Sequence, residues 1–324
     1  MRKGRRKDNT VTMDVRATRD GYGDALVELG EKDERIVVLG ADLTSSTRAS
    51  SFATRFPERF VEVGIAEQNA MNVAAGLSMA GKIPFVSTYA VFVTGRALDQ
   101  IRTTVCYSNL NVKIAGAHGG ISVGPDGATH QALEDVAIMR SLPNMTVIVP
   151  CDYYETKKAI IWSVGHVGPC YVRFGREPVP LLTQPDSVFT CGEGYVIREG
   201  TDLTILNNGP LLRQCLDALD LLASAGISAR LVNVHTVKPI DREIIARAAE
   251  ETGAIVTVEE HQVQGGFGSA VAEVVVQETP VPMRFVGIQD RFGESGTPEE
   301  LFAAFGLTAE DIAEAAEDVL RAKG

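Results

Sequence analysis

Residues 60–80 of this chain read Phe-Val-Glu-Val-Gly-Ile-Ala-Glu-Gln-Asn-Ala-Met-Asn-Val-Ala-Ala-Gly-Leu-Ser-Met-Ala. The apolar run Phe60–Val63 predicts a short buried strand, and the longer apolar stretch Glu67–Ala80 predicts a helix. Only three residues, Gly64–Ala66, separate the two elements. A strand that passes so directly into a helix is the repeating unit of parallel sheets covered by helices, so this stretch indicates the fold.

The same alternation of strand-like and helix-like segments continues on both sides of this stretch. The runs that read as strands are Arg35–Leu39, Phe60–Val63, Pro84–Ser87, Val112–Ala115, Thr146–Val149, Cys170–Arg173, Leu203–Asn207, Ala229–Asn233, Ala254–Glu259 and Met283–Gly287. The stretches that read as helices are Gly21–Leu29, Glu67–Ala80, Arg96–Tyr107, Glu134–Ser141, Tyr154–Val164, Leu211–Ala225, Asp241–Glu251 and Gly268–Glu278. This order predicts an α/β fold with mostly parallel sheets that carry helices on both faces.

The chain length and one proline-rich segment divide the sequence into two domains. At roughly 150 residues per domain, 324 residues suffice for about two domains. A seam lies at residues 177–192, where three prolines interrupt any helical period. We therefore predict a basic tail at 1–13, a first domain at 14–180, a linker at 181–192 and a second domain at 193–324.

Charge and composition argue against several classes of function. With 42 acidic and 31 basic residues, the net charge of −11 does not attract nucleic acid or anionic lipid. No apolar run approaches the roughly 18 residues that a membrane span needs. The five cysteines form no C-x-x-C pair, which is typical of reduced thiols. No apolar segment follows the basic cluster at residues 2–7, so no secretory signal is indicated and we expect a cytoplasmic protein.

Chemically distinctive residues follow two of the predicted strands, at the ends where parallel sheets collect their ligands. Glu67 begins the helix of residues 67–80, a position where the helix dipole alone also favours a carboxylate. Tyr89 and Phe92 follow the strand of residues 84–87, and two aromatic residues at this spacing usually belong to a core. The residue types alone leave both interpretations open.

A third polar segment, Ala117–Gln131, is a glycine-rich loop. It contains four glycines together with His118, Asp126 and His130. Loops of this composition commonly carry function. The two histidines lie twelve residues apart and have no neighbouring cysteine, so their spacing does not indicate a metal site. A His-Asp-His set without a serine or cysteine nucleophile in a triad context does not indicate hydrolysis either.

Three stretches of the sequence together resemble the transketolase family. They are Gly64-Ile65-Ala66-Glu67-Gln68-Asn69, Gly124-Pro125-Asp126-Gly127-Ala128-Thr129-His130-Gln131 and Pro143-Asn144-Met145-Thr146-Val147-Ile148. The resemblance extends over nearly the whole chain, starting near residue 14. It implies a pyrimidine-binding domain followed by a transketolase C-terminal domain, both of the α/β class predicted above.

The resemblance implies thiamine diphosphate as the cofactor. Glu67 stands at the position of the family's glutamate, which hydrogen-bonds the pyrimidine ring and promotes removal of a proton from the cofactor. Phe92 matches the residue that stacks on this ring, and Tyr89 lies beside it. We therefore predict Glu67, His118 and His130 as the catalytic residues and no metal ligand in this chain.

The family's substrates are phosphorylated sugars, which need both hydroxyl and phosphate contacts. His118, Asp126 and His130 match positions that contact substrate hydroxyls. Phosphate groups need cations, best supplied by guanidinium groups. The residues at the family's phosphate-binding positions are Arg19, Ser46 and Arg176. An isolated arginine is also typical of a surface ion pair, so this assignment rests on the joint match.

The family's other domain, which holds the diphosphate and a divalent metal, carries a Gly-Asp-Gly motif. This motif does not occur in the sequence. The chain therefore resembles the C-terminal subunit of a split transketolase. This resemblance implies an N-terminal partner subunit that holds Mg²⁺ or Ca²⁺, in an α2β2 heterotetramer. The implied reaction, part of the pentose phosphate pathway, moves a two-carbon ketol unit from xylulose 5-phosphate to ribose 5-phosphate or erythrose 4-phosphate.

Departures from the family pattern leave alternatives open. Gly95 stands where the family commonly has another aromatic residue, and Pro125 and Ala128 alter the glycine-rich loop. The loop shares features with deoxyxylulose-phosphate synthase, while the length resembles the beta subunit of a 2-oxo acid dehydrogenase. A non-catalytic assembly subunit is the alternative from another class. In the second half we interpret Glu259-Glu260-His261 and Gln264–Gly268 as a turn and helix start in a domain that mainly builds an interface.

Overall fold

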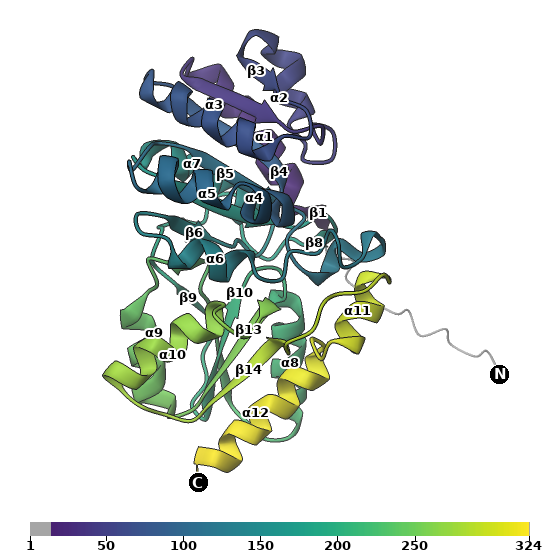
Figure 1. Cartoon of the computed structure of the whole chain (residues 1–324). Helices are drawn as coiled ribbons and strands as arrows, with labels where there is room; N and C mark the ends of the chain where they lie inside the picture. The colour runs from purple at the N-terminus through teal and green to yellow at the C-terminus, as the bar shows by residue number, and fades with distance from the viewer. Residues whose placement is uncertain (1–13, 324) are drawn as a thin grey trace, which may run out of the picture.

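The computed structural model describes residues 14–323, and two sheets organise this part of the chain (Figure 1). The first sheet has seven strands in the order β12 (Thr236–Lys238), β6 (Thr146–Ile148), β7 (Cys170–Phe174), β5 (Lys113–Ala117), β4 (Ile83–Tyr89), β2 (Ile36–Gly40) and β3 (Phe60–Glu62). All neighbours run parallel except β12, which pairs antiparallel with β6. The carboxyl ends of the parallel strands consequently meet at one edge.

The second sheet has five strands and is also mostly parallel. Its order is β14 (Met283–Ile288), β13 (Ile255–Gln262), β10 (Leu203–Asn208), β11 (Ala229–Asn233) and β9 (Tyr195–Arg198), with β9 antiparallel to β11. The short strands β1 (Val15–Ala17) and β8 (Pro178–Pro180) form a separate antiparallel pair. The predicted α/β fold with two mostly parallel sheets is therefore confirmed.

Helices cover both faces of the first sheet. One face carries α1 (Thr18–Lys32), α2 (Ser50–Arg55), the 3₁₀ turn η1 (Pro57–Arg59) and α7 (Tyr153–Gly165). The other face carries α3 (Glu67–Met79), α4 (Ala90–Arg96), α5 (Leu98–Gln100), the π-helical segment η2 (Ile101–Cys106) and α6 (Asp135–Ser141). A further 3₁₀ segment, η3 (Ile121–Asp126), lies in the glycine-rich loop. Apolar stripes of these helices bury the sheet.

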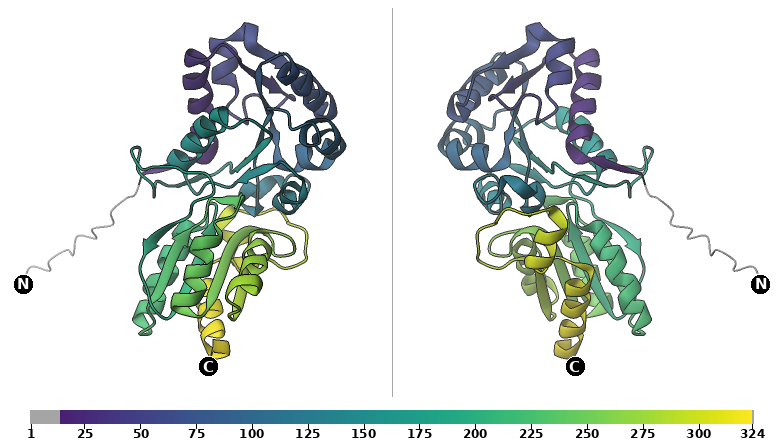
Figure 2. Two further views of the ribbon diagram at one scale, coloured as in Figure 1. Left: turned by 90° about the vertical axis from the view of Figure 1, so that its left-hand side faces the viewer. Right: turned by 90° about the vertical axis from the view of Figure 1, so that its right-hand side faces the viewer.

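The second sheet is covered in the same way. Its helices are α8 (Leu212–Ser224), α11 (Pro298–Ala304) and α12 (Ala309–Lys323) on one face and α9 (Arg242–Thr252) and α10 (Phe267–Glu278) on the other. The two halves of the chain form two stacked lobes (Figure 2). None of the helices within residues 14–323 is long and apolar enough to cross a membrane.

The two lobes share a continuous apolar core. Met139 and Val147 of the first lobe belong to the same buried cluster as Leu206 and Val232 of the second. In addition, β12 from the second half of the chain joins the sheet of the first half. The tail that was expected at residues 1–13 lies outside the described residues, and the domain boundaries remain predictions.

One expected helix was wrong in its start and its form. We expected a helix over residues 96–107, but α4 already ends at Arg96, and a separate helical stretch of α5 and the π-helical η2 follows it. The Tyr107 amide donates to the Arg102 carbonyl at 3.0 Å, five residues back, which marks the wider turn. The β-branched residues Val91 and Val93 hid the start of α4, because they resemble a continuation of the preceding strand.

Candidate active site

Glu67 is buried although it begins a helix. Gly64 adopts a positive φ of 72°, which turns the chain sharply from β3 into α3. The Glu67 side chain is 2% exposed, and its carboxylate accepts a hydrogen bond from Arg96 Nη1 at 2.9 Å. A helix-start acid that served only the dipole would not need this burial. The position therefore suits a carboxyl group that contacts a bound ligand.

Arg96 was missed by the sequence analysis, and it completes the surroundings of Glu67. Its guanidinium lies 4.1 Å from the centroid of the Phe92 ring, while 49% of its side chain is exposed. A flat, hydrogen-bond-donating group thus already stacks on Phe92 and bonds to Glu67. The aminopyrimidine ring of thiamine diphosphate has the same two properties, so Glu67 and Phe92 fit that ring. The sequence signal that pointed to Arg96 was its neighbour Gly95, which stands where the family commonly has an aromatic residue.

Four predicted site residues form one aromatic cluster at the ends of β4 and β5. The Tyr89 ring stacks on His118 with centroids 4.0 Å apart and on Phe92 with centroids 5.7 Å apart. The edge of His130 meets Phe92 at 5.3 Å and Tyr89 at 6.0 Å. Tyr89 ends β4 and His118 directly follows β5, and parallel pairing of these neighbouring strands brings their carboxyl ends together.

His118 occupies a constrained and electropositive position. Its φ of 56° is left-handed, and its side chain is almost fully buried. Burial lowers its pKa to about 3, with smaller contributions from the positive charges of Arg19 and Arg176. His118 is therefore neutral at physiological pH. Within residues 14–323 its Nδ1 atom has no hydrogen-bond partner, which leaves it able to pair with a hydroxyl group.

Three arginines gather near His118, and the sequence analysis named two of them. Burial lowers the pKa of Arg19, and the positive charges of Arg48 and Arg176 lower it further. Arg19 Nη1 donates to the Ser46 carbonyl at 3.1 Å, so Ser46 orients the arginine through its backbone. The Arg19 Nε atom is buried without a partner in the described part of the chain. Clustered guanidinium groups with spare donors are suited to a phosphate group.

Asp126 and Arg176 lie in contact. Arg176 donates from Nη1 to Asp126 Oδ2 at 3.2 Å, and its Nε lies 3.2 Å from Glu177. The residue expected to contact hydroxyl groups thus meets a residue expected to contact phosphate. The structure places Glu67, Phe92 and Arg96 in one group and the three arginines with Asp126 in another, with the Tyr89–His118–His130 cluster between them.

No group of three or more histidine, cysteine, aspartate or glutamate side chains within residues 14–323 is placed to hold a metal ion. The acidic residues near the arginines instead form ion pairs, as Asp20 does with Arg48 at 2.7 Å.

Comparison with known proteins relates this geometry to a family. Residues 14–180 match the family "Transketolase, pyrimidine binding domain", and residues 192–312 match "Transketolase, C-terminal domain". A protein of Methanocaldococcus jannaschii described as a transketolase C-terminal section is 46% identical over 91% of this chain and 93% of its own length. A 6-deoxy-6-sulfo-D-fructose transketolase subunit from a Clostridium species is 43% identical over 97% of both chains.

A solved structure agrees with these sequence relatives. It is a split-gene transketolase described as an inactive beta4 tetramer, 52% identical to this chain, and the match covers 95% of this chain and 99% of that one. Its TM-score is 0.89. The resemblance inferred from three short stretches is thereby confirmed. The chain belongs to the transketolase family, and over nearly its whole length it corresponds to the C-terminal subunit of a split transketolase.

Proposed function

We propose that this chain forms the pyrimidine-binding half of a thiamine diphosphate site and transfers a two-carbon ketol unit together with an N-terminal partner subunit. The observation that carries the proposal is the buried carboxylate of Glu67 beside the stacking face of Phe92. A flat group already occupies both contacts in the form of the Arg96 guanidinium. Because that arginine is half exposed, it can swing into solvent when a ring takes its place.

Each protein group has a distinct task in this proposal. Thiamine diphosphate supplies the nucleophilic carbon that takes up the two-carbon unit. Glu67 hydrogen-bonds the pyrimidine ring and holds its proton in place, while Phe92 fixes the plane of the ring. The neutral His118 and the adjacent His130 exchange hydrogen bonds with substrate hydroxyl groups, and Tyr89 keeps His118 in position by stacking.

The proposed substrates are sugars with an anionic end. Arg19 and Arg176, with the neighbouring Arg48, form a cationic cluster next to the hydroxyl-binding residues. Ser46 orients Arg19, and Asp126 orients Arg176. The Clostridium relative is named for a sulfonated sugar, which shares the anionic end with a sugar phosphate. We take xylulose 5-phosphate as donor and ribose 5-phosphate or erythrose 4-phosphate as acceptor, in the pentose phosphate pathway of the cytoplasm.

The proposed assembly is an α2β2 heterotetramer. The partner subunit holds the diphosphate and its Mg²⁺ or Ca²⁺ ion, because the family's Gly-Asp-Gly motif for these groups does not occur in this sequence. A related split-gene chain is described as inactive when it forms a beta4 tetramer. We extend this behaviour to the present chain and expect it to be inactive without its partner. Closed two-fold symmetry is the commonest arrangement for such assemblies.

The test mixes this chain with a candidate N-terminal subunit, thiamine diphosphate and Mg²⁺. Turnover of xylulose 5-phosphate with ribose 5-phosphate is expected in the mixture. Xylulose 5-phosphate that remains unconsumed with every sugar phosphate acceptor would overturn the donor assignment. A parallel panel with 6-deoxy-6-sulfo-D-fructose as donor then defines which anionic end the arginines accept.

A second candidate function follows from the altered glycine-rich loop. Pro125 and Ala128 replace the family's usual glutamate and proline, and the loop as a whole shares features with deoxyxylulose-phosphate synthase. That activity, like that of a 2-oxo acid dehydrogenase beta subunit, would consume pyruvate or another 2-oxo acid as donor. The same mixture assayed with pyruvate and glyceraldehyde 3-phosphate separates these enzymes from a transketolase. A non-catalytic assembly subunit would give no turnover with any donor.

A further inference from the structure

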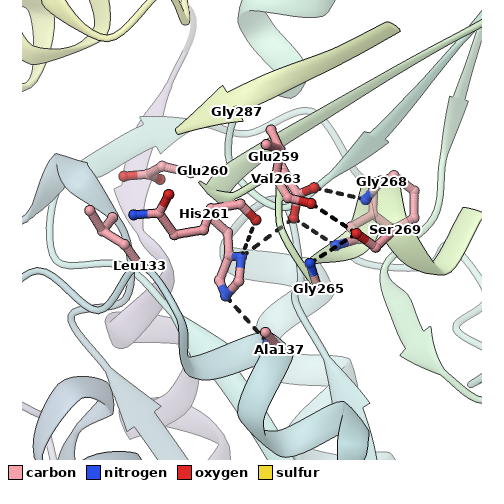
Figure 3. A network of polar contacts seen from close by, with 12 residues as sticks. Leu133, Ala137, Glu259, Glu260, His261, Val263, Gly265, Gly268, Ser269 and Gly287 are labelled. Atoms are coloured by element: carbon pink, nitrogen blue, oxygen red, sulfur yellow. Dashed lines mark hydrogen bonds and ion pairs between the residues drawn. The ribbon is translucent and has the colours of Figure 1, made fainter. Parts of the chain in front are cut away.

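Strand β13 ends in three consecutive ionisable residues that are almost fully buried. Glu259, Glu260 and His261 are 2%, 1% and 1% exposed. The predicted strand ended at Glu259, and the interpretation of Glu260 and His261 as part of a turn and helix start was wrong, because β13 continues through them to Gln262. Figure 3 shows that their side chains leave the strand in different directions. Each of the three side chains therefore contacts a different part of the structure.

Glu259 and His261 make contacts that explain their burial locally. The Glu259 carboxylate accepts hydrogen bonds from the amides of Phe267 and Gly268, at 2.6 and 2.7 Å, at the start of α10. His261 accepts a bond at Nε2 from the Ala137 amide at 3.3 Å and contacts the Gln262 carbonyl through Nδ1 at 2.7 Å (Figure 3). Glu259 thus caps a helix of its own lobe.

Glu260 instead reaches across to the glycine-rich loop of the first lobe. Its Oε1 atom accepts a hydrogen bond from the Ser122 amide at 2.5 Å. Its backbone carbonyl accepts a bond from Arg173 Nη2 at 2.8 Å, and Arg173 Nε donates to Asp135 at 3.0 Å. Glu260 is thus fixed to the loop through its side chain and to Arg173 through its backbone carbonyl.

The loop lies so close to these two side chains that only glycine fits. A Cβ atom on Gly120 would collide with the Glu260 carboxylate, and one on Gly119 would lie 2.5 Å from Arg173 Nε. The residue before them, His118, has a left-handed φ of 56°. A side-chain-bearing residue keeps such a conformation only where its surroundings enforce it. Arg173 and Glu260 lie against the two glycines that directly follow His118.

We propose that Glu260 is a positioning residue for substrate binding, which acts by holding residues Gly119–Ser122 and thereby the placement of His118. This inference rests on the proposed function, since it assigns the loop to the substrate. It gives the C-terminal lobe a direct part in forming the substrate site. The positioning runs through a backbone hydrogen bond, so the carboxylate itself touches no substrate.

The first experiment measures amide hydrogen exchange on the chain alone. Glu260→Ala should speed exchange across residues 119–124 at least tenfold, because it removes the acceptor of the Ser122 amide. Glu260→Gln retains an acceptor and should restore protection to within threefold of the wild type. The matched control is Glu259→Ala, which lies on the same strand and should accelerate exchange only in the first turn of α10. Unchanged exchange at 119–124 in Glu260→Ala would overturn the proposal.

A second variant removes the same hydrogen bond from the other side. Ser122→Pro eliminates the donor without altering the buried charges, and proline is tolerated in a first helical turn. It should raise exchange in the loop as Glu260→Ala does. This variant decides the question if Glu260→Ala fails to fold, and normal protection at residues 119–121 would then refute the positioning role.

Kinetics of the assembled enzyme complete the test. Glu260→Ala should raise KM for the sugar phosphate at least tenfold while kcat changes less than threefold, and Glu259→Ala should leave KM unchanged. A residue that only stabilises the fold would lower the active fraction and leave KM unchanged, so that result contradicts the proposal. If the wild-type mixture shows no turnover, the proposed function fails, and the exchange measurements still decide whether Glu260 holds the loop.

Discussion

Two acid–arginine pairs of nearly equal length lie in different environments. Glu67 and Arg96 are 2.9 Å apart, and the arginine side chain is 49% exposed. Asp135 and Arg173 are 3.0 Å apart, and the arginine side chain is only 3% exposed. Asp135 also accepts a hydrogen bond from the Tyr171 hydroxyl, and Arg173 donates to two backbone carbonyls.

This difference in burial implies that the Glu67–Arg96 contact can be replaced, whereas the Asp135–Arg173 contact is permanent. A half-exposed arginine can exchange its partner for water at little cost, so the Glu67 site can open for a ring. A buried arginine that loses its partner leaves an uncompensated charge, so Arg173 cannot move. The site region is therefore adaptable, whereas the region beneath the glycine-rich loop is rigid.

The largest effect is expected for Glu67→Gln. This variant keeps a hydrogen bond to Arg96 but removes the ionisable group, and general acid–base steps contribute roughly 100- to 10,000-fold. Turnover of the assembled enzyme should fall by that factor while the melting temperature stays the same. Glu58→Gln, an exposed change at the neighbouring sheet edge, is the control. Normal turnover in Glu67→Gln would mean that Glu67 is only a helix-start acid.

Asp135→Ala removes the acid of the buried Asp135–Arg173 pair. Removing one partner of a buried pair typically costs about 3–5 kcal/mol, so the free energy of unfolding should fall by that amount. Denaturant titration measures it. Asp220→Ala, which breaks the exposed pair with Arg198, is the control and should change little. A loss below about 1 kcal/mol in Asp135→Ala would contradict the assignment of a rigid region.

Arg176→Ala separates phosphate binding from structure. A charge-assisted contact contributes roughly 1.5–3 kcal/mol, which corresponds to a loss of about 10- to 150-fold in kcat/KM for phosphorylated donors. Hydroxypyruvate, which has no phosphate, should be affected much less. Arg242→Ala, an exposed arginine of α9, serves as control. Equal losses for both donor types would show that Arg176 serves only as the ion-pair partner of Asp126.

The low pKa of His118 predicts how the stability of the chain depends on pH. The pKa of about 3 in the folded chain lies below the value of 6.5 for a free histidine. The unfolded chain therefore binds the extra proton between these values, so stability falls as the pH drops below 6.5. The contribution should reach about 2 kcal/mol at pH 5, and His118→Gln should abolish it. An imidazole resonance of His118 that titrates near pH 6.5 would disprove this.

The smallest effect is expected for Arg96→Ala. Because this arginine is half exposed, water can take its place at the buried Glu67 carboxyl group, and the free energy of unfolding should change by less than about 1 kcal/mol. The matched variant, Arg173→Ala, should lower the free energy of unfolding by several times that amount. Similar losses in both variants, measured by the same denaturant titration, would remove the distinction between the two pairs.

Local sequence patterns were enough to predict the alternation of strands and helices and the family to which the chain belongs. The helix start at Glu67 follows from residues within one stretch, and the meeting of Tyr89 with His118 follows from the pairing of adjacent parallel strands. Arg96 was not predicted because Gly95 indicated only a missing aromatic residue, and nothing local indicated that Arg96 would stack on Phe92. The roles of the site residues remain predictions.

Contacts between distant segments could not be predicted from local patterns. Ser122 and Glu260 are separated by 138 positions, and no periodicity connects them. Strand β12 has only three residues and a register shift, so it carries no recognisable pattern, yet it joins the first sheet. By contrast, the capping box formed by Thr297 and Glu300 is a local signal from which the start of α11 could have been predicted.

The central claim is that this chain contributes the pyrimidine half of a shared active site. The most direct test adds increasing amounts of this chain to a fixed amount of the N-terminal subunit, with saturating thiamine diphosphate and Mg²⁺, and records ketol transfer. The account predicts no turnover for either subunit alone and a plateau when the two are present in equal numbers. Full turnover by this chain alone would contradict it.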